Sequence, residues 1–260
     1  MATQVQTKFS RLTADLQPPV ARVSLHNPPL NVIDVPMMEE LSQALTDIES
    51  RNDMAVVVLN APGKAFSVGV DVAAHTPDKV QEMLTKFHAV IRGLVGSKKV
   101  TIAAVQGHCL GGGAELAMVC DLVFTTEMAK WAFPEIKLAC YPPVACTALA
   151  ALVGPKRAAD LILTGRTISG KEAAEIGLAN QAVDGELEQL VDDTLRELVK
   201  LSPAALAVTK KAMYAWDAMH FDKGLARAEK IYFDELMKTE DAQEGVAAFL
   251  QKREPVWKGK

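Results

Sequence analysis

Segments that read as strands alternate with helical patterns through the first half of the chain, and this alternation constrains the fold more than any other feature. Strand-like runs rich in β-branched and apolar residues lie at 20–27, 54–62, 100–107 and 121–126. Helical patterns at about 35–51 and about 78–95 separate the first three of these runs. Such an alternation is typical of crossover units in which helices cover a sheet, so it predicts an α/β fold.

The pattern changes after about Gly185, because no later segment reads as a strand. Three helical patterns follow, at 185–201, 202–216 and about 223–252. With 260 residues and an apolar fraction of 49%, the chain can bury a sizeable core in one main domain. No low-complexity linker divides it. The sequence therefore predicts an α/β core followed by a helical C-terminal region.

Three consecutive glycines, Gly111 to Gly113, close an apolar run and open a helix. Glycines at such a corner let a backbone N–H approach a ligand closely, and the N-terminus of a helix favours an anion. Glu115 follows within the first helical turn, among apolar residues, and Glu135 comes twenty residues later, directly after a proline. A buried carboxylate needs a partner or a raised pKa. Together these residues could stabilise an oxyanion and move a proton, although the glycines alone could serve tight packing.

Several other kinds of site have little support. The glycines lack the spacing of a dinucleotide fingerprint, and no Lys-Ser or Lys-Thr pair follows them as in a P-loop. The net charge of −4 and the scattered Lys and Arg argue against a nucleic-acid partner. The five histidines form no H-x-x-x-H pair, so no metal is expected. No run of about 18 apolar residues is long enough to span a membrane.

The spacing and surroundings of the cysteines indicate in which cellular compartment the protein is expected. Cys109, Cys120, Cys140 and Cys146 show no C-x-x-C spacing and lie in apolar surroundings. Reduced cysteines in a core are typical of an intracellular protein. No signal region precedes the first strand. We therefore expect a cytoplasmic protein.

Seven segments in order resemble the crotonase (enoyl-CoA hydratase/isomerase) superfamily. They are NPPLNVID at 27–34, KAFSVGVD at 64–71, the glycine–glutamate stretch at 106–135, FPEIKL at 133–138, LTGRTISGKEAAEIGLANQAV at 163–183, SPAALAVTKKAM at 202–213 and EGVAAFLQKR at 244–253. The resemblance covers nearly the whole chain. It implies a spiral of ββα units over residues 1–200. It also implies that residues 201–260 form a helical region for trimerisation and coenzyme A contact, in a homotrimer or homohexamer.

The resemblance also implies an oxyanion hole for the thioester oxygen of an acyl-CoA. The matching backbone amides are those of Val70 and Gly112. Val70 stands where the family commonly has alanine, but only its N–H is needed. The segment 67–71 could alternatively be a simple turn that ends a strand.

Hydratases of this family use two glutamates that hold one water molecule. Glu115 and Glu135 match both positions. Two carboxylates in one small apolar pocket cannot both ionise cheaply, so one should be protonated. We assign Glu115 as the base that deprotonates water and Glu135 as the acid that protonates Cα. Because the two titrate as a coupled pair, the order could be shared or reversed.

Coenzyme A enters as part of the substrate, and no separate cofactor is expected. The family pattern places it along the backbone near Leu30 and Val68. Phe233 and Lys252 match positions that contact the coenzyme from the C-terminal helices. Lys252 could equally be a solvated charge on a helix.

The segment 141–147 departs from the family pattern, because hydratases of straight-chain substrates usually carry a glycine-rich loop there. Tyr141 and Pro143 belong to a stiffer, bulkier loop that should reshape the acyl pocket and could replace a backbone donor near the water. We expect Val144, Ala145 and Cys146 to give the pocket apolar walls.

This departure, the stretch 75–88 and the Cys109-Leu110 variant resemble hydratases of cyclic dienoyl-CoA thioesters, such as cyclohexa-1,5-diene-1-carbonyl-CoA, from aromatic compound degradation. The alternatives are a straight-chain enoyl-CoA hydratase of fatty acid metabolism, and another crotonase chemistry such as isomerisation or thioester hydrolysis. A non-enzymatic relative would predict decay of the glutamates, which are both present.

Overall fold

Two sheets organise the chain in a computed structural model that describes residues 9–259, without the side chains of 215–219. The larger sheet has the strand order β1-β2-β3-β5-β7-β10. Its strands are β1 (Leu12–Gln17), β2 (Val20–Leu25), β3 (Val56–Asn60), β5 (Val100–Val105), β7 (Leu122–Thr126) and β10 (Gln181–Val183). Only β1 and β2 pair antiparallel.

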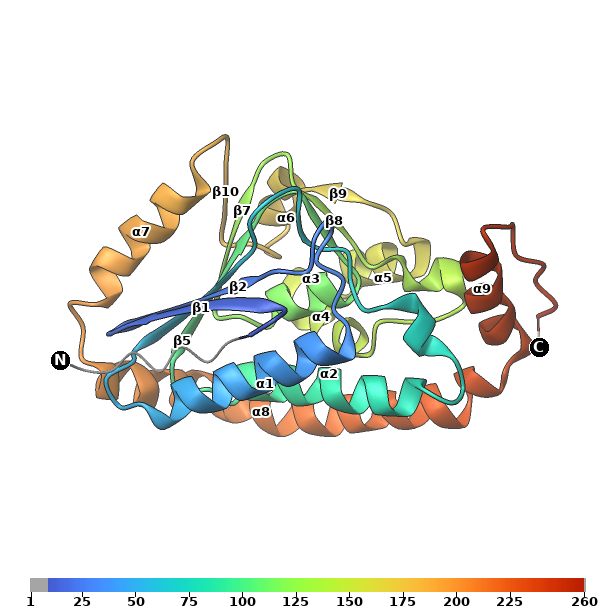
Figure 1. Cartoon of the computed structure of the whole chain (residues 1–260), viewed down its shortest axis with the longest axis horizontal. Coiled ribbons are helices and arrows are strands. Elements are labelled where there is room, and N and C mark those ends of the chain that lie inside the picture. The colour runs from blue at the N-terminus through green and yellow to red at the C-terminus, as the bar shows by residue number, and fades with distance from the viewer. Residues whose placement is uncertain (1–8, 260) are drawn as a thin grey trace.

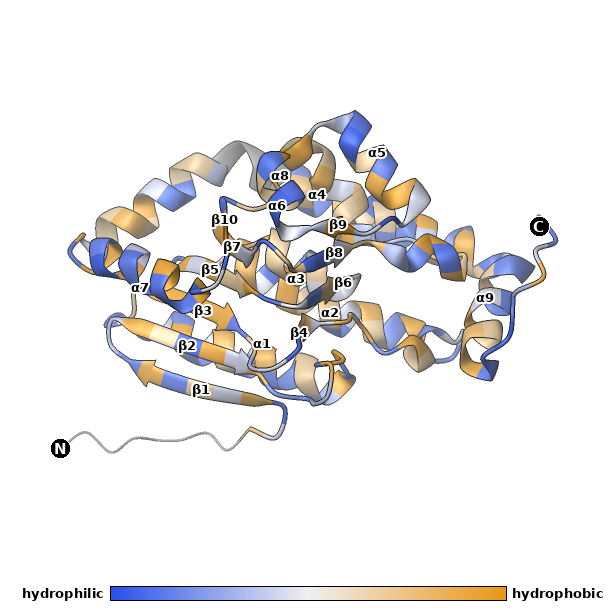
Figure 2. Cartoon of the chain, turned by 90° about the horizontal axis from the view of Figure 1, so that it is seen from above, coloured by the Kyte–Doolittle hydropathy of each residue, from blue (hydrophilic) through white to orange (hydrophobic). Residues whose placement is uncertain are grey.

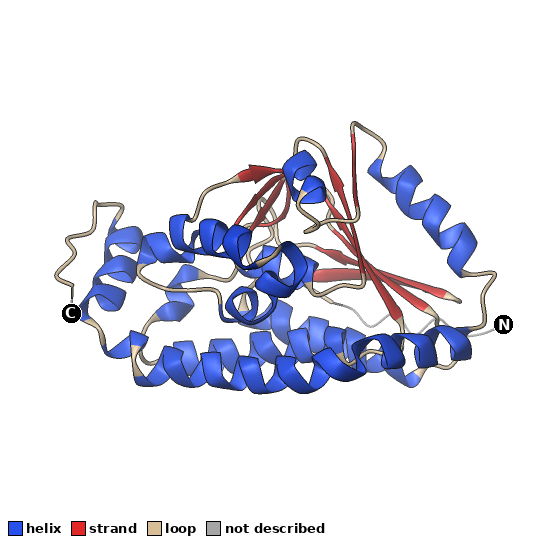
Figure 3. Cartoon of the chain, turned by 180° about the vertical axis from the view of Figure 1, so that it is seen from behind, coloured by secondary structure: helices blue, strands red, loops and turns tan. Residues whose placement is uncertain are grey.

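The smaller sheet has the order β4-β6-β8-β9. Its strands are β4 (Ala65–Ser67), β6 (His108–Leu110), β8 (Lys130–Ala132) and β9 (Ile168–Ser169). The chain adds β3, β5 and β7 to the large sheet, and after each of them it adds β4, β6 and β8 to the small one. Each turn of the chain therefore extends both sheets by one strand, which produces a spiral (Figure 3).

Three long helices, α1 (Val35–Ser50), α2 (Val80–Val95) and α8 (Pro203–Asp234), lie side by side beneath the large sheet (Figure 1). Asp34 caps α1 by accepting a hydrogen bond from the Met37 amide, and Ser202 caps α8 through the Ala205 amide. The shorter helices are α3 (Gly112–Met118), α4 (Pro143–Val153), α5 (Pro155–Thr164), α6 (Gly170–Glu175), α7 (Leu187–Leu198) and α9 (Glu240–Gln251). The 3-10 turns are η1 (Val72–His75), η2 (Pro134–Leu138) and η3 (Leu236–Lys238). Helices α7 and α9 lie at opposite ends of the molecule (Figure 2).

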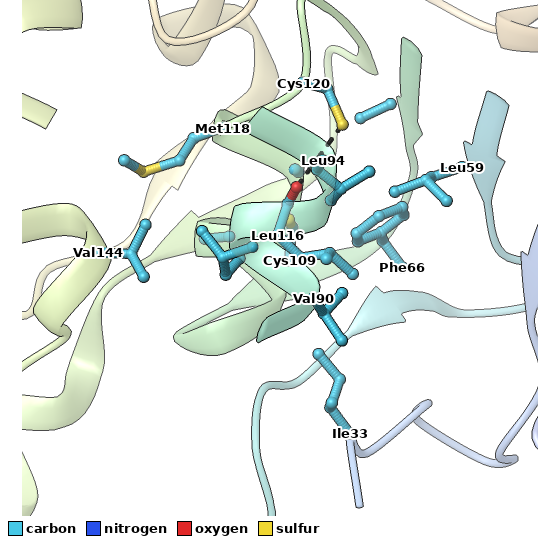
Figure 4. Close-up of a cluster of buried hydrophobic side chains, with 14 of the residues drawn as sticks. Ile33, Leu59, Phe66, Val90, Leu94, Cys109, Leu116, Met118, Cys120 and Val144 are labelled. Atoms are coloured by element: carbon cyan, nitrogen blue, oxygen red, sulfur yellow. Dashed lines mark hydrogen bonds between the residues drawn. The ribbon is translucent and has the colours of Figure 1, made fainter. Parts of the chain in front are cut away.

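Helix α3 lies in the middle of the core. All seven of its residues are buried, including Glu115. Figure 4 shows Leu116 and Met118 among apolar side chains from α2, β3, β4, β6 and α4. Every residue of β5, the strand that leads toward α3, is buried as well. A carboxylate carried by such a helix is removed from water on every side except where a cavity reaches it.

The predicted α/β class and the crotonase-like spiral are confirmed, and no strand follows Gly185 in the described residues. Two expectations are wrong. Helix α8 continues through residues 217–222, where the sequence suggested a break. Cys146 is exposed, whereas the other three cysteines are buried. The sequence analysis also missed β1 and β10 of the larger sheet and the short strands of the smaller sheet.

Candidate active site

One cavity of about 80 Å³ collects most of the residues that the sequence singled out. It lies where β4 and β6 end, between η2, the start of α4, and the helices α2 and α8. Its wall includes Val68, Val70, Gly112, Glu115, Glu135, Tyr141 and Pro143. Val68 and Tyr232 are 164 positions apart in the sequence, and both line this cavity.

The amides of Val70 and Gly112 lie beside each other at the edge of this cavity. A Cβ added to Gly112 would come within 3.4 Å of the Val70 nitrogen and 2.7 Å of Val70 Cγ2. Neither amide donates a hydrogen bond to another described residue. The missing Cβ at position 112 therefore leaves space in front of two unused donors, which is the geometry needed to bind an oxyanion.

Glu115 is held by the N-terminus of α4. Its Oε1 accepts a hydrogen bond of 2.8 Å from the Val144 amide and one of 2.9 Å from the Ala145 amide. Both amides belong to the first turn of a helix, where backbone N–H groups have no partner within the helix. Pro143 at the first helical position lacks an N–H and fits there without loss. These two donors stabilise the ionised form of Glu115.

Glu135 has the opposite environment. Its Oε2 is buried and has no hydrogen-bond partner among the described residues. Its Oε1 lies against Gly111, where an added Cβ would approach to 2.6 Å. Gly111 also has a φ of 52°, which favours glycine. A carboxyl group without donors is more stable in its neutral form.

The two carboxyl groups consequently differ in protonation. Burial raises the pKa of Glu115 to about 7, against the opposing effect of its two backbone hydrogen bonds. Burial and the nearby charge of Glu115 raise the pKa of Glu135 well above its usual range. Glu115 accepts two backbone N–H donors from α4, whereas Glu135 receives a backbone hydrogen bond only within its own residue, so Glu115 ionises more readily. Glu115 therefore ionises near pH 7, where Glu135 is still protonated.

Apolar side chains form most of the remaining wall. Met83, Leu84 and Phe87 come from one face of α2. His75 at the end of η1 also lines the cavity, and burial lowers its pKa, so it is neutral at pH 7. Such a wall suits a hydrocarbon acyl group.

The segment 141–147 is only partly the stiff loop that we expected. From Pro143 onward it is helix α4, whose first turn holds Glu115. Tyr141, Pro142 and Pro143 line the cavity, but Val144, Ala145 and Cys146 do not. The backbone amides of Val144 and Ala145 bind Glu115 instead. Cys146 lines a separate pocket of about 640 Å³ that also includes Tyr141.

A groove of about 610 Å³ shares Val68 and Val70 with the cavity and runs toward α9. Its wall carries two cations that the sequence analysis missed, Lys137 and Arg253. Arg253 pairs with Glu244, at 2.7 Å between Nη2 and Oε2. Lys137 is exposed and makes no ion pair with any described residue. Most of its other lining residues are apolar, so the groove combines an apolar wall with two cations.

Three residues from the sequence analysis lie outside both spaces. Leu30 is exposed, and its carbonyl accepts a hydrogen bond of 3.2 Å from the Val68 amide. Phe233 packs half-buried against the core, and Lys252 is exposed at the end of α9. None of the three lines the cavity or the groove in this chain by itself.

Within residues 9–259 no group of three or more His, Cys, Asp or Glu side chains is arranged to hold a metal ion. None of the described helices combines the length and the apolar character needed to cross a membrane.

Comparison with known proteins gives one family. The enoyl-CoA hydratase/isomerase family model matches residues 15–260. A cyclohexa-1,5-dienecarbonyl-CoA hydratase from Thauera aromatica is 33% identical over 239 residues, which are 92% of this chain and 93% of that protein. A probable enoyl-CoA hydratase from Bacillus subtilis is 34% identical over 247 residues, 92% of this chain and 95% of that protein.

A solved structure agrees with the sequence comparison. The crystal structure of an enoyl-CoA hydratase from Mycobacterium avium subsp. paratuberculosis matches with a TM-score of 0.86 at 27% identity. The match covers 96% of this chain and all of that one.

Proposed function

The chain belongs to the enoyl-CoA hydratase/isomerase family, and we propose that it adds water across the double bond of an α,β-unsaturated acyl-CoA. It is an enzyme of the enoyl-CoA hydratase type. The observation that carries the proposal is the cavity itself, whose wall includes Glu115 with two backbone donors, Glu135 with an unpartnered Oε2, and the residues Val70 and Gly112, whose amides are unused.

The reaction follows from these groups. The thioester oxygen binds between the amides of Val70 and Gly112, which stabilise the negative charge that develops on it. Glu115 takes a proton from water as the water oxygen bonds to Cβ, and Glu135 gives its proton to Cα. At the end Glu115 is neutral and Glu135 is ionised. One proton must then pass from Glu115 to Glu135 before the next turnover.

For the acyl group we propose a cyclic dienoyl-CoA such as cyclohexa-1,5-diene-1-carbonyl-CoA. The small, mostly apolar cavity supports a compact ring, since it leaves little space for a long chain. Two adjacent prolines, Pro142 and Pro143, restrict the segment that would have to open for such a chain. The Thauera aromatica relative, whose name states this substrate, supports the same choice.

A straight-chain 2-enoyl-CoA is the alternative, since the Bacillus subtilis relative carries the general name. Values of kcat/KM for crotonyl-CoA, a C10 enoyl-CoA and cyclohexa-1,5-diene-1-carbonyl-CoA decide between them. We expect the cyclic thioester to be the best substrate. If the C10 thioester is best, the ring proposal is wrong. If the double bond shifts and no hydroxyl appears, the enzyme is an isomerase.

A further inference from the structure

Tyr232 carries a buried hydroxyl that nothing in the proposed mechanism uses. It lies near the end of α8, its residue is 1% exposed, and its ring lines the same cavity as Glu115 and Glu135. The hydroxyl has no nitrogen or oxygen hydrogen-bond partner among the described residues. The Cys140 thiol is close enough to accept a hydrogen bond from it, but a thiol is a weak partner. A buried O–H without a strong partner destabilises the folded chain, so it requires an explanation.

The neighbouring tyrosine shows what a satisfied hydroxyl looks like here. The ring centroids of Tyr141 and Tyr232 are 5.0 Å apart, in an edge-to-face arrangement. The hydroxyl of Tyr141 turns away and donates a hydrogen bond of 2.6 Å to the Ala228 carbonyl on α8. The hydroxyl of Tyr141 therefore stabilises the packing of α8, whereas the hydroxyl of Tyr232 is an unused donor.

The position of Tyr232 is fixed by charged contacts one turn earlier on α8. Glu229 accepts a hydrogen bond of 3.0 Å from Arg92 Nη2 and lies 2.7 Å from His88 Nδ1, both on α2. Since Phe87 and Leu84 on α2 also line the cavity, the same helix pair carries the wall and holds the tyrosine. The hydroxyl is consequently preorganised.

The second orphaned atom on this wall is Glu135 Oε2. Glu135 and Tyr232 line the same cavity of about 80 Å³, and burial together with the charge of an ionised Glu135 raises the pKa of Tyr232, so the two groups are close. One water molecule needs only about 10–15 Å³ of such space. Burial raises the pKa of Tyr232, so its hydroxyl stays a neutral donor at the pH where the enzyme works.

We propose that Tyr232 is a further positioning and specificity residue, whose hydroxyl donates a hydrogen bond to the reacting oxygen at C3 of the acyl group. This inference rests on the proposed hydration. In that reaction the oxygen of the bound water becomes the C3 hydroxyl of the product. The Tyr232 hydroxyl can therefore donate a hydrogen bond to the water before the reaction and to the product hydroxyl after it. The ligand class is an acyl-CoA with an oxygen atom at C3.

The test uses two unreactive thioesters that differ in this oxygen. Acetoacetyl-CoA carries a C3 oxygen that can only accept a hydrogen bond, and butyryl-CoA has none. Tyr232→Phe should weaken the binding of acetoacetyl-CoA about tenfold, as expected for about 1.4 kcal/mol from one lost hydrogen bond. The binding of butyryl-CoA should stay within twofold. Hydration of the best enoyl-CoA should lose kcat, with little change in KM.

Tyr141→Phe is the matched control, because it removes a hydroxyl from the same wall. It breaks the bond to Ala228, so it should lower the melting temperature and leave the acetoacetyl-to-butyryl affinity ratio as in the wild type. Tyr232→Phe removes an unpaired hydroxyl, so it should keep or raise the melting temperature. Tyr232→Met provides a second variant of the same position without the hydroxyl.

Equal affinity ratios in the wild type and in both Tyr232 variants overturn the inference. So does a Tyr232→Phe variant that loses affinity for both thioesters alike, since that is a packing effect. Because the affinities are measured without turnover, they separate this inference from the hydration proposal. A changed ratio in an enzyme that hydrates no enoyl-CoA would leave Tyr232 as the oxygen donor and remove the hydratase mechanism.

Discussion

The amide of Val144 donates a hydrogen bond of 2.8 Å to Glu115 Oε1, and this contact connects the start of α4 to α3, the helix that carries Glu115. Ala145 adds a second donor at 2.9 Å. Glu135 receives no such bond at Oε2. The backbone of α4 therefore lowers the pKa of Glu115 relative to that of Glu135, and the charge of Glu115 raises the pKa of Glu135 further.

Replacing either carboxyl group should stop hydration without preventing thioester binding. Glu115→Gln and Glu135→Gln should each lower kcat by about 10²–10⁴, the usual contribution of a positioned acid or base. Steady-state kinetics and calorimetric titration with butyryl-CoA measure the two effects. Turnover near the wild-type rate in either variant would remove the two-carboxyl mechanism.

The raised pKa of Glu115 should appear in the pH dependence of stability. Its pKa is about 7 in the folded chain, against 4.5 for an ordinary glutamate. Between these values the unfolded chain loses the proton first, so the free energy of unfolding falls as pH rises from about 4.5 to 7. Below that window both states are protonated, and the stabilising contribution is fully present.

Glu115→Gln should reduce this slope, because glutamine has no proton to lose; the remaining slope comes from Glu135, whose pKa is also raised. Urea unfolding at pH 5, 6, 7 and 8 and at one protein concentration measures the slope. A variant with the same slope as the wild type would show that Glu115 does not titrate in this range. Glu172→Gln on α6 is a surface control that should leave the slope nearly unchanged.

Gly112→Ala should damage the oxyanion hole. The new methyl group would lie 2.7 Å from Val70 Cγ2 and in front of the Val70 amide, so kcat/KM should fall about 10²–10³, as for loss of one oxyanion donor. The control is Gly93→Ala in α2, whose methyl group would meet Leu45 Cδ1 at an ordinary 3.6 Å. That change should stabilise the helix by up to about 1 kcal/mol and keep activity. Equal activity of the two variants would contradict the role of Gly112.

The chain should assemble into a trimer or a dimer of trimers. Ile231 is 37% and Phe249 53% exposed, so both leave apolar surface on the C-terminal helices, whereas Phe233 and Leu236 pack against the core. Apolar surface of this kind is commonly covered by another subunit. Light scattering should give about three or six times the 28.0 kDa of one chain. A mass near 28.0 kDa would contradict assembly.

The sequence was most informative where short-range patterns decide the structure. Alternating strand and helix patterns predicted the α/β class, since side-chain periodicity is a local property. The glycine corner predicted a helix after β6, and α3 begins at Gly112. The break expected before Lys223 was wrong: the helix continues, and Gly224, which could have ended it, lies against Thr147 of α4, where a Cβ would come within 2.8 Å.

By itself, then, the sequence determined the class of fold, the helical C-terminal region and the two glutamates as candidates. Only the tertiary structure distinguishes their environments, because the donors of Val144 and Ala145 to Glu115 come from an element 29 and 30 residues away. It also places Tyr232 and Glu135 in the wall of one cavity. A local sequence pattern cannot predict such contacts, because they depend on how elements far apart in the sequence pack together. Burial then sets the charge of each group, because a carboxyl in an apolar core ionises only where donors meet it.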